Sequence, residues 1–205
     1  MIHEQTAQRL VLWFSNAANY VTVFGLLLSL TGCSFALAGN LGLSVTSLVL
    51  AGICDLFDGA IARRIERTAE EKRFGVQLDT VVDVVSFAVT PVVIVRCVLG
   101  APWYALIVYA FYIVAAVVRL AYFTASALPE GETTRYMGLP VTYIALILPV
   151  VLLVGWPPLI LGALVATGAL FVLNVPVPKP RGIWYGVFPA VAIALIVLLL
   201  VWWVP

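Results

Sequence analysis

The chain has 205 residues, of which 63% are hydrophobic and only 10% are charged, and its formal net charge is +1. A soluble domain of this length cannot bury so much apolar surface, so we expect an integral membrane protein. The small net charge argues against a nucleic-acid partner. The three cysteines lie at wide spacings in apolar runs, which indicates small buried side chains rather than a disulfide framework or a zinc site.

The first 18 residues combine polar and charged side chains with Trp13 and Phe14, a pattern typical of a short amphipathic helix on the membrane surface. His3 is the only histidine and has no partner nearby in the sequence, so we interpret it as solvated. The segment lacks the ordered basic region, apolar core and small-residue cleavage site of a secretory signal. We therefore expect the first apolar helix to be retained.

Seven apolar stretches follow, and a helix of about 20 residues is enough to cross the roughly 30 Å apolar layer of a bilayer. The predicted spans are 20–38, 41–62, 75–98, 103–124, 138–154, 158–173 and 183–204. A rigid, basic, proline-rich connection over 174–181 precedes the last span, and Trp202 and Trp203 near its end predict interfacial anchors. The predicted fold class is therefore an all-α integral membrane protein.

The basic residues indicate how the chain is oriented. If the N-terminus lies inside, the outer turns near 39–41, 99–102 and 155–157 carry no charge, and Arg96 is the one basic residue against the trend. The inner loops then collect Arg9, Arg63, Arg64, Arg67, Lys72, Arg73, Arg135, Lys179 and Arg181. The positive-inside rule therefore predicts a multi-pass protein of the cytoplasmic membrane with its N-terminus inside.

All four aspartates of the chain lie between residues 55 and 83, at the junction of the second and third predicted spans. Asp55 and Asp58 are three positions apart and Asp79 and Asp83 are four apart, so on helices each pair shares one face. Four ionised carboxylates beside a bilayer would be very costly without a cation. Oxygen ligands favour Mg2+ or Mn2+, and a two-metal site suits displacement at phosphorus. Helix capping would explain one such aspartate more readily than four.

The same stretch reads Asp-x2-Asp-Gly-x2-Ala-Arg, then eleven residues, then Gly-x3-Asp-x3-Asp. It resembles the signature of the CDP-alcohol phosphotransferase family at all eight positions: Asp55, Asp58, Gly59, Ala62, Arg63, Gly75, Asp79 and Asp83. The gap from Arg63 to Gly75 is longer than is common in that family. Because this insert is charged, we expect it to be a solvated extension of the loop between the two helices.

The resemblance implies a fold and a site. It implies a six-helix catalytic bundle over 19–180, flanked by the amphipathic segment 1–18 and by an additional C-terminal transmembrane helix over 181–205. It implies two divalent cations, Mg2+ or Mn2+, on the four aspartates, and a homodimer. The positive-inside assignment places the active site on the cytoplasmic side. The residues that it assigns to the cytidine nucleotide are Asn19, Thr22, Gly59, Ala62, Arg63 and Gly75. Small residues allow close backbone approach there, and an arginine offers phosphate a planar fork.

Three further stretches, 77–91, 119–123 and 136–140, resemble the phosphatidylserine synthase branch of the family, although Ala88 and Tyr122 depart from its usual Gly and Arg. This resemblance implies that the donor is CDP-diacylglycerol, that the acceptor is the hydroxyl of L-serine, and that CMP is released. Within this scheme Asp83 is our candidate for the general base.

The candidate acceptor contacts are Ser86, Arg119 and Arg135. An arginine within an apolar run faces a polar site or extends to the interface, and we favour the site for Arg119. The hydroxyl of Ser86 has two possible partners, the active-site polar groups or its own backbone one turn back. The backbone bond is the commoner one for a serine in a membrane helix, so we expect it here.

Two alternatives stay open on the sequence alone. Another acceptor, such as glycerol 3-phosphate, inositol phosphate or choline, would keep the same metals and donor. A phosphorylated acceptor calls for several cations, whereas only Arg96, Arg119 and Arg135 lie in or next to spans three to five. A cation or proton transporter would need polar residues spread through the membrane depth, whereas these aspartates lie at one level.

Overall fold

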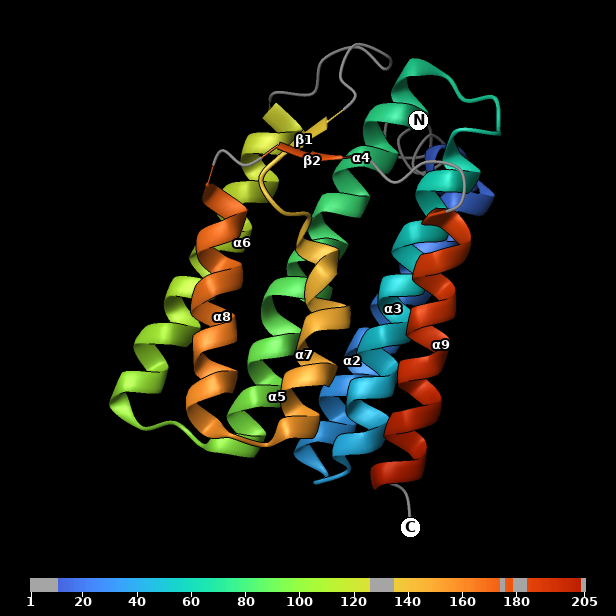
Figure 1. The fold of residues 1–205 in the computed structure, drawn as a ribbon. Helices are drawn as coiled ribbons and strands as arrows, with labels where there is room; N and C mark the ends of the chain where they lie inside the picture. Colours follow the sequence, from blue (N-terminus) through green and yellow to red (C-terminus); the bar gives the residue numbers. More distant parts are fainter. Residues whose placement is uncertain (1–10, 126–134, 174–175, 179–183, 204–205) are drawn as a thin grey trace.

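The computed structural model describes residues 11–125, 135–173, 176–178 and 184–203, which form a bundle of roughly parallel and antiparallel helices (Figure 1). The helices are α2 (Ala17–Leu37), α3 (Leu41–Ala62), α4 (Ala69–Asp83), a π-helical segment (Val84–Val89), α5 (Thr90–Leu99), α6 (Trp103–Ala125), a short 3-10 turn (Val141–Tyr143), α7 (Ile144–Val154), α8 (Pro157–Val172) and α9 (Trp184–Trp203). Two three-residue strands, β1 (Arg135–Met137) and β2 (Pro176–Pro178), pair antiparallel at one end. The predicted all-α membrane bundle is confirmed.

Four helices in the described part of the chain are long and apolar enough to cross a membrane: Ala17–Leu37, Leu41–Ala62, the continuous run Ala69–Leu99, and Trp103–Ala125. Three further apolar helices are shorter: Val141–Val154, Pro157–Val172 and Gly186–Val201. The predicted amphipathic segment lies largely outside the described residues, as does His3, although residues 11–14 are helical. The side chains of Trp202 and Trp203 also lie outside the described part.

The charged insert is partly helical, so the prediction that it only extends the loop was wrong. Helix α4 begins at Ala69 because Thr68 and Glu71 form a capping box. The Glu71 amide donates to Oγ1 of Thr68 over 3.2 Å, and Oε2 of Glu71 accepts from the Thr68 amide over 2.7 Å. Glu70 and Glu71 also place negative charge at the positive end of the helix dipole. Residues 69–74 therefore extend the aspartate-bearing helix beyond the signature.

Helices α2 and α3 approach closely because small residues lie between them. A Cβ atom added to Gly25 would lie 3.1 Å from Cβ of Cys54, and one added to Gly32 would lie 3.1 Å from the Ser44 carbonyl oxygen. Small residues let membrane helices pack backbone against backbone. This contact sets the distance at which side chains of α2 reach the aspartates of α3.

The π-helical segment joins α4 to α5 and is held by hydroxyl groups. The Tyr112 hydroxyl of α6 donates to the Phe87 carbonyl over 2.7 Å, and Oγ1 of Thr90 donates to the Val85 carbonyl over 2.9 Å. Single π-helical turns occur frequently at functional sites. Here the turn lies directly after Asp83, so it determines which way the next side chains point.

Helix α9 packs against α3 and α7 at one edge of the bundle (Figure 1). Ala192 and Leu199 are its buried residues, at 3% and 0% exposure. Near its start, the rings of Phe188 and Tyr143 meet edge to face with centroids 5.2 Å apart. The last predicted span therefore packs on the bundle itself.

Candidate active site

The four aspartates meet where α3 and α4 face each other. Asp55, Asp58 and Asp79 each offer a carboxylate oxygen, and these oxygens all lie within 4.8 Å of one another. Asp83 lies at hydrogen-bonding distance from Asp55. The structure thus brings together the carboxylates that the helical spacing places on shared faces. An all-oxygen donor set at a partly buried position fits a hard divalent cation, so the cluster could hold a metal.

Two threonine hydroxyls orient the carboxylates of α3. Oγ1 of Thr22, from α2, donates to Oδ2 of Asp58 over 2.6 Å. Oγ1 of Thr142, from the turn before α7, donates to Oδ2 of Asp55 over 2.8 Å. Partners of this kind fix the orientation of metal-binding carboxylates. Thr22 was a predicted nucleotide contact, whereas the sequence analysis missed Thr142, because only folding brings it to Asp55.

A pocket of about 390 Å3 adjoins the aspartates, within the usual range for small-molecule sites. All four aspartates line it. The six residues that the resemblance assigns to the nucleotide also line it: Asn19, Thr22, Gly59, Ala62, Arg63 and Gly75. The structure therefore brings the whole signature, from α3 and α4, to one pocket together with Asn19 and Thr22 of α2.

The surroundings of Gly75 leave little space for a side chain. An added Cβ atom would lie 3.0 Å from Nη1 of Arg67 and 3.3 Å from Oδ1 of Asn19. The side-chain Nδ2 of Asn19 donates to the backbone carbonyls of Trp13 and Phe14 over 3.1 and 3.3 Å, which connects the segment before α2 to the pocket. Asn19 thus contacts both the pocket and the segment before α2.

Arg67 is a pocket residue that the sequence analysis missed. It belongs to the charged insert, which we expected to be solvated, yet it lines the pocket and is only partly exposed. Its Nη2 donates to the Ala62 carbonyl at the end of α3 over 3.0 Å. No pattern in the sequence distinguishes Arg67 from Arg64 or Arg73, because the path of the loop decides which arginine turns inward.

The three predicted acceptor contacts have separate locations. Arg119 is 6% exposed and lines the pocket, with its guanidinium carbon 5.1 Å from the centre of the Phe123 ring. Arg135 is in β1, and its side chain lies outside the described part. Ser86 is buried but is not among the residues that line this pocket. Its hydroxyl has no hydrogen-bond partner among the described residues, so the expected bond to its own backbone was wrong.

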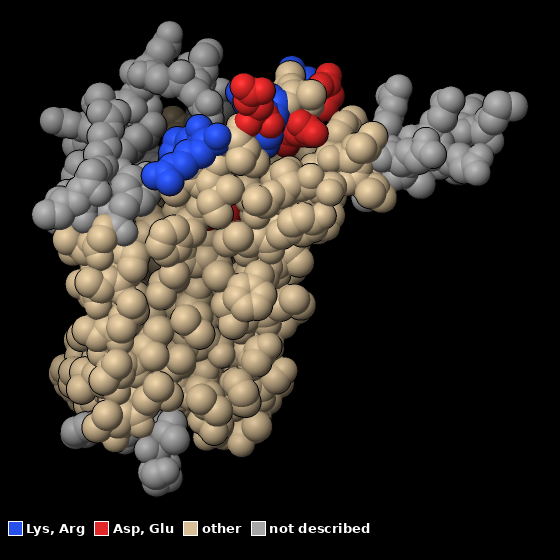
Figure 2. Space-filling view, turned by 90° about the vertical axis from the view of Figure 1, so that its right-hand side faces the viewer, with Lys and Arg blue, Asp and Glu red and all other residues tan. Residues whose placement is uncertain are grey.

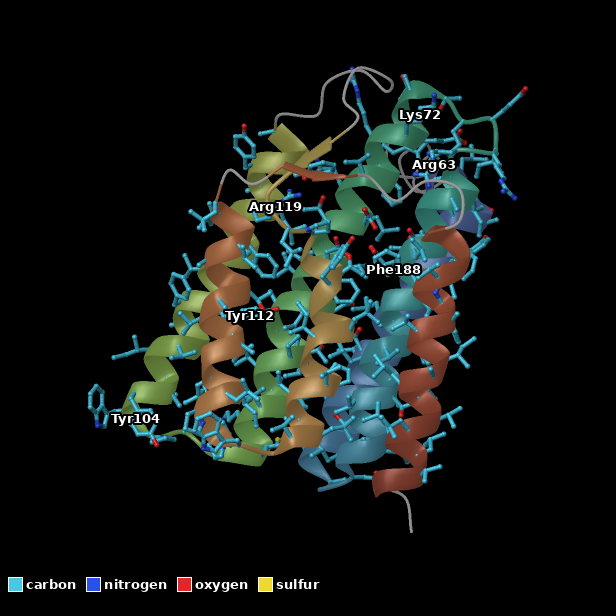
Figure 3. The ribbon with its side chains drawn as sticks, viewed as in Figure 1. Arg63, Lys72, Tyr104, Tyr112, Arg119 and Phe188 are labelled. Atoms are coloured by element: carbon cyan, nitrogen blue, oxygen red, sulfur yellow. The ribbon has the colours of Figure 1, made fainter. Side chains whose placement is uncertain are left out.

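The pocket has a polar end and an apolar wall. Phe188, Pro189 and Ala192 of α9 contribute to the wall, together with residues of α7 such as Leu146. Figure 3 shows Arg63, Lys72 and Arg119 toward one end of the bundle and Tyr104 at the other. On the face in Figure 2, the charged side chains of the described residues likewise gather at one end, above a surface of uncharged residues. This polarity matches an amphiphilic ligand at the edge of a bilayer.

The fold and the site together define a helical membrane protein with a carboxylate cluster beside an amphiphilic pocket. The chain belongs to the CDP-alcohol phosphatidyltransferase family, whose sequence model matches residues 15–177. The match includes every aspartate and ends before α9.

Curated relatives share limited identity with the chain. A CDP-diacylglycerol–serine O-phosphatidyltransferase of Mycobacterium bovis is 28% identical over 125 residues, which is 58% of this chain and 43% of the relative. The Helicobacter pylori protein of the same name is 28% identical over 148 residues, which is 67% of this chain and 59% of the relative. An uncharacterized Aquifex aeolicus protein is 37% identical over 84 residues, which is 40% of this chain and 41% of the relative. The chain thus spans about half the length of the curated relatives it matches.

Proposed function

We propose that the chain is a phosphatidylserine synthase, which transfers the phosphatidyl group of CDP-diacylglycerol to L-serine and releases CMP. The observation that carries this proposal is the pocket, which the four aspartates line together with three arginines (Arg63, Arg67 and Arg119) and an apolar wall. A CDP-linked lipid fits this arrangement, because its anionic pyrophosphate lies between a nucleotide and two hydrocarbon chains. The choice of serine is supported by the three stretches that resemble phosphatidylserine synthases (77–91, 119–123 and 136–140) and by the names of the relatives.

Two divalent cations, Mg2+ or Mn2+, would be held by Asp55, Asp58, Asp79 and Asp83. When bound, they supply positive charge that stabilises the transferring phosphate and the departing CMP. The donor set fits because it offers only oxygen ligands, and threonine hydroxyls orient two of the four carboxylates.

The cytidine nucleotide is assigned to the side of the pocket formed by Asn19, Gly59 and Gly75. Neither glycine has a side chain that would keep a ligand away from the backbone. Arg63 and Arg67 both line this side, and guanidinium groups donate paired hydrogen bonds to phosphate oxygens. Arg67 thus joins the set that the signature predicts.

Asp83 is assigned as the general base. Its carboxylate accepts the proton of the serine hydroxyl as the serine oxygen bonds to the lipid-side phosphorus. The phosphoanhydride bond breaks, and CMP leaves with the bonding electron pair. Asp83 is 8% exposed and lines the pocket, so bulk water has little access to the acceptor proton.

Arg119 is assigned to the carboxylate of serine. It comes from α6, lines the pocket and is buried, and an arginine at membrane depth usually faces a polar site. The guanidinium lies over the Phe123 ring, which is a cation–π contact. Arg135 remains a second proposed contact.

The assignment is tested by CMP release from CDP-diacylglycerol by the purified protein. L-serine, glycerol 3-phosphate, inositol and inositol phosphate are offered separately with Mn2+ or Mg2+. We expect release with serine alone, and loss of release when EDTA is added. Release with another acceptor instead would overturn the serine assignment and keep the donor and the site.

The site is proposed to face the cytoplasm, with the N-terminus inside, and the protein is proposed to act as a homodimer, as the resemblance implies. The orientation is tested in a cysteine-free variant that carries either Arg64→Cys or Ala101→Cys. These positions lie in loops at opposite ends of the bundle. An impermeant thiol reagent should label only the Ala101→Cys protein in intact cells, and labelling of Arg64→Cys alone would reverse the orientation.

A further inference from the structure

A second, much smaller chamber lies one helical turn deeper than the aspartates. Gly25 of α2, Ala51 of α3, and Ser86 and Phe87 of the π-helical segment form its deeper part. The four aspartates and Thr22 line both this chamber and the large pocket. The carboxylates therefore lie between the large pocket and the chamber, and they line both.

Ser86 lines the chamber and is 1% exposed, and its hydroxyl has no hydrogen-bond partner among the described residues. Most helical hydroxyls in this bundle donate to the carbonyl four residues back. They belong to Ser29, Thr31, Ser34, Ser47, Thr80, Thr124 and Thr167. Ser86 lies in the π-helical segment, where backbone bonds span five residues instead of four. Its hydroxyl makes no bond of this kind, and Ser86 lines the chamber.

The chamber has a volume of about 10 Å3. A single water needs at least about 10–15 Å3 of such space and two to four polar partners. A buried hydroxyl without a partner is costly, so a polar occupant is favoured over an empty space. The volume of the chamber therefore limits its occupant to one water. The aspartate carboxylates and the Ser86 hydroxyl, which line the chamber, provide the polar partners.

We propose that this chamber binds one ordered water that links Ser86 to the aspartates of α4. The Ser86 hydroxyl donates to the water, and the water donates to chamber-side oxygens of Asp79 and Asp83. We assign the water to this pair because the α3 pair already accepts from Thr22 and Thr142. Ser86 is then a positioning residue, which holds the α4 carboxylates as the two threonines hold those of α3. This inference rests on the proposed metal-binding role of the cluster.

The test is Mn2+ binding by the purified protein, measured from the electron paramagnetic resonance signal of free Mn2+. We expect Ser86→Ala to weaken Mn2+ binding by about 10- to 100-fold, as removal of other groups that orient metal ligands does. Saturating Mn2+ should restore most of kcat, since Ser86 does not touch the substrate. If the hydroxyl is merely buried and unsatisfied, its removal will leave Mn2+ affinity unchanged and raise Tm without metal, which would overturn the proposal.

Thr46 provides a matched control. Its hydroxyl is also buried without a partner among the described residues, but Thr46 lines neither the chamber nor the pocket. Thr46→Val should therefore leave Mn2+ affinity unchanged, and an equal loss in both variants would refute a specific role for Ser86. Failure of the wild-type protein to bind Mn2+ would instead contradict the proposed metal site.

A second measurement uses the wild-type protein, so it tests the proposal even if Ser86→Ala does not fold. In the wild-type protein, a density map that resolves ordered waters should show one peak between Ser86 and the carboxylates of Asp79 and Asp83. An empty chamber in such a map would refute the proposal. A peak whose height follows the Na+ concentration would refute it too, because the occupant would then be a monovalent cation.

Discussion

The hydroxyl of Thr142 donates a hydrogen bond to Oδ2 of Asp55 over 2.8 Å, although the two residues are 87 positions apart. The bond joins the carboxylate cluster to the Gly138-Leu-Pro140 element that precedes α7. That element is one of the stretches that resemble phosphatidylserine synthases. The side chain of Thr142 therefore links the turn before α7 directly to the proposed metal site.

Thr142→Val removes this hydroxyl and keeps the shape of the side chain. We expect metal affinity or activity to fall by about 10- to 100-fold, because Asp55 loses the donor that orients it. Mn2+ titration and CMP release measure the two effects. Thr142→Ser keeps the hydroxyl and should stay close to wild type, so an equal loss in both variants would argue for packing instead of the hydrogen bond.

Asp83→Asn should lower kcat for CMP release by at least about 10²-fold, because an amide cannot accept the serine proton. The side chain keeps its size, so the protein should remain folded, as judged by Tm and by size-exclusion chromatography. Glu66→Gln, at an exposed position in the α3–α4 loop, is the charge-matched control. Near-wild-type turnover in Asp83→Asn would refute the assignment of the base.

Gly75→Ala should raise KM for CDP-diacylglycerol by up to about 10²-fold, because small displacements of binding groups have large kinetic effects. The new Cβ atom would lie 3.0 Å from Nη1 of Arg67 and 3.3 Å from Asn19, so both side chains must move. Gly162→Ala is the control, since an added Cβ atom there meets nothing within 4 Å. Equal KM values for the two variants would contradict the proposed crowding at the nucleotide.

Arg67→Gln should raise KM for CDP-diacylglycerol by about 10- to 100-fold, the usual effect of a lost hydrogen bond to a charged group. Arg64→Gln removes the same charge from the same loop, but Arg64 is exposed and does not line the pocket. We expect its KM to stay near wild type. A loss of Tm in Arg67→Gln with unchanged KM would mean that Arg67 only caps α3 through the Ala62 carbonyl.

Ala192→Trp should raise KM for a long-chain donor by about tenfold or more, because Ala192 lines the pocket at 3% exposure and a large side chain overfills it. Ile193→Trp adds a similar group one position along α9, where the side chain is 57% exposed, and should change KM little. Equal effects in both variants would show that α9 does not contribute a wall of the donor site.

Much of the fold and of the site could be predicted from local patterns. The bounds predicted for the second span, 41–62, coincide with α3, and those of the first, 20–38, lie within three residues of α2. The third span was predicted to begin at 75, whereas α4 begins at Ala69. The pattern Thr68-x-x-Glu71 is a capping-box signal that the high charge of the insert obscured.

The sequence by itself determined the all-α membrane class, the faces on which the four aspartates lie, and the family. Helical periodicity and apolar length are local properties, so they can be read without knowing which helices touch. Only the tertiary structure decided that Thr142 binds Asp55, that Arg67 turns into the pocket, that α9 lines it, and that Ser86 lies in a separate chamber. These contacts depend on the register between helices, which close packing of small residues sets and which no single segment encodes.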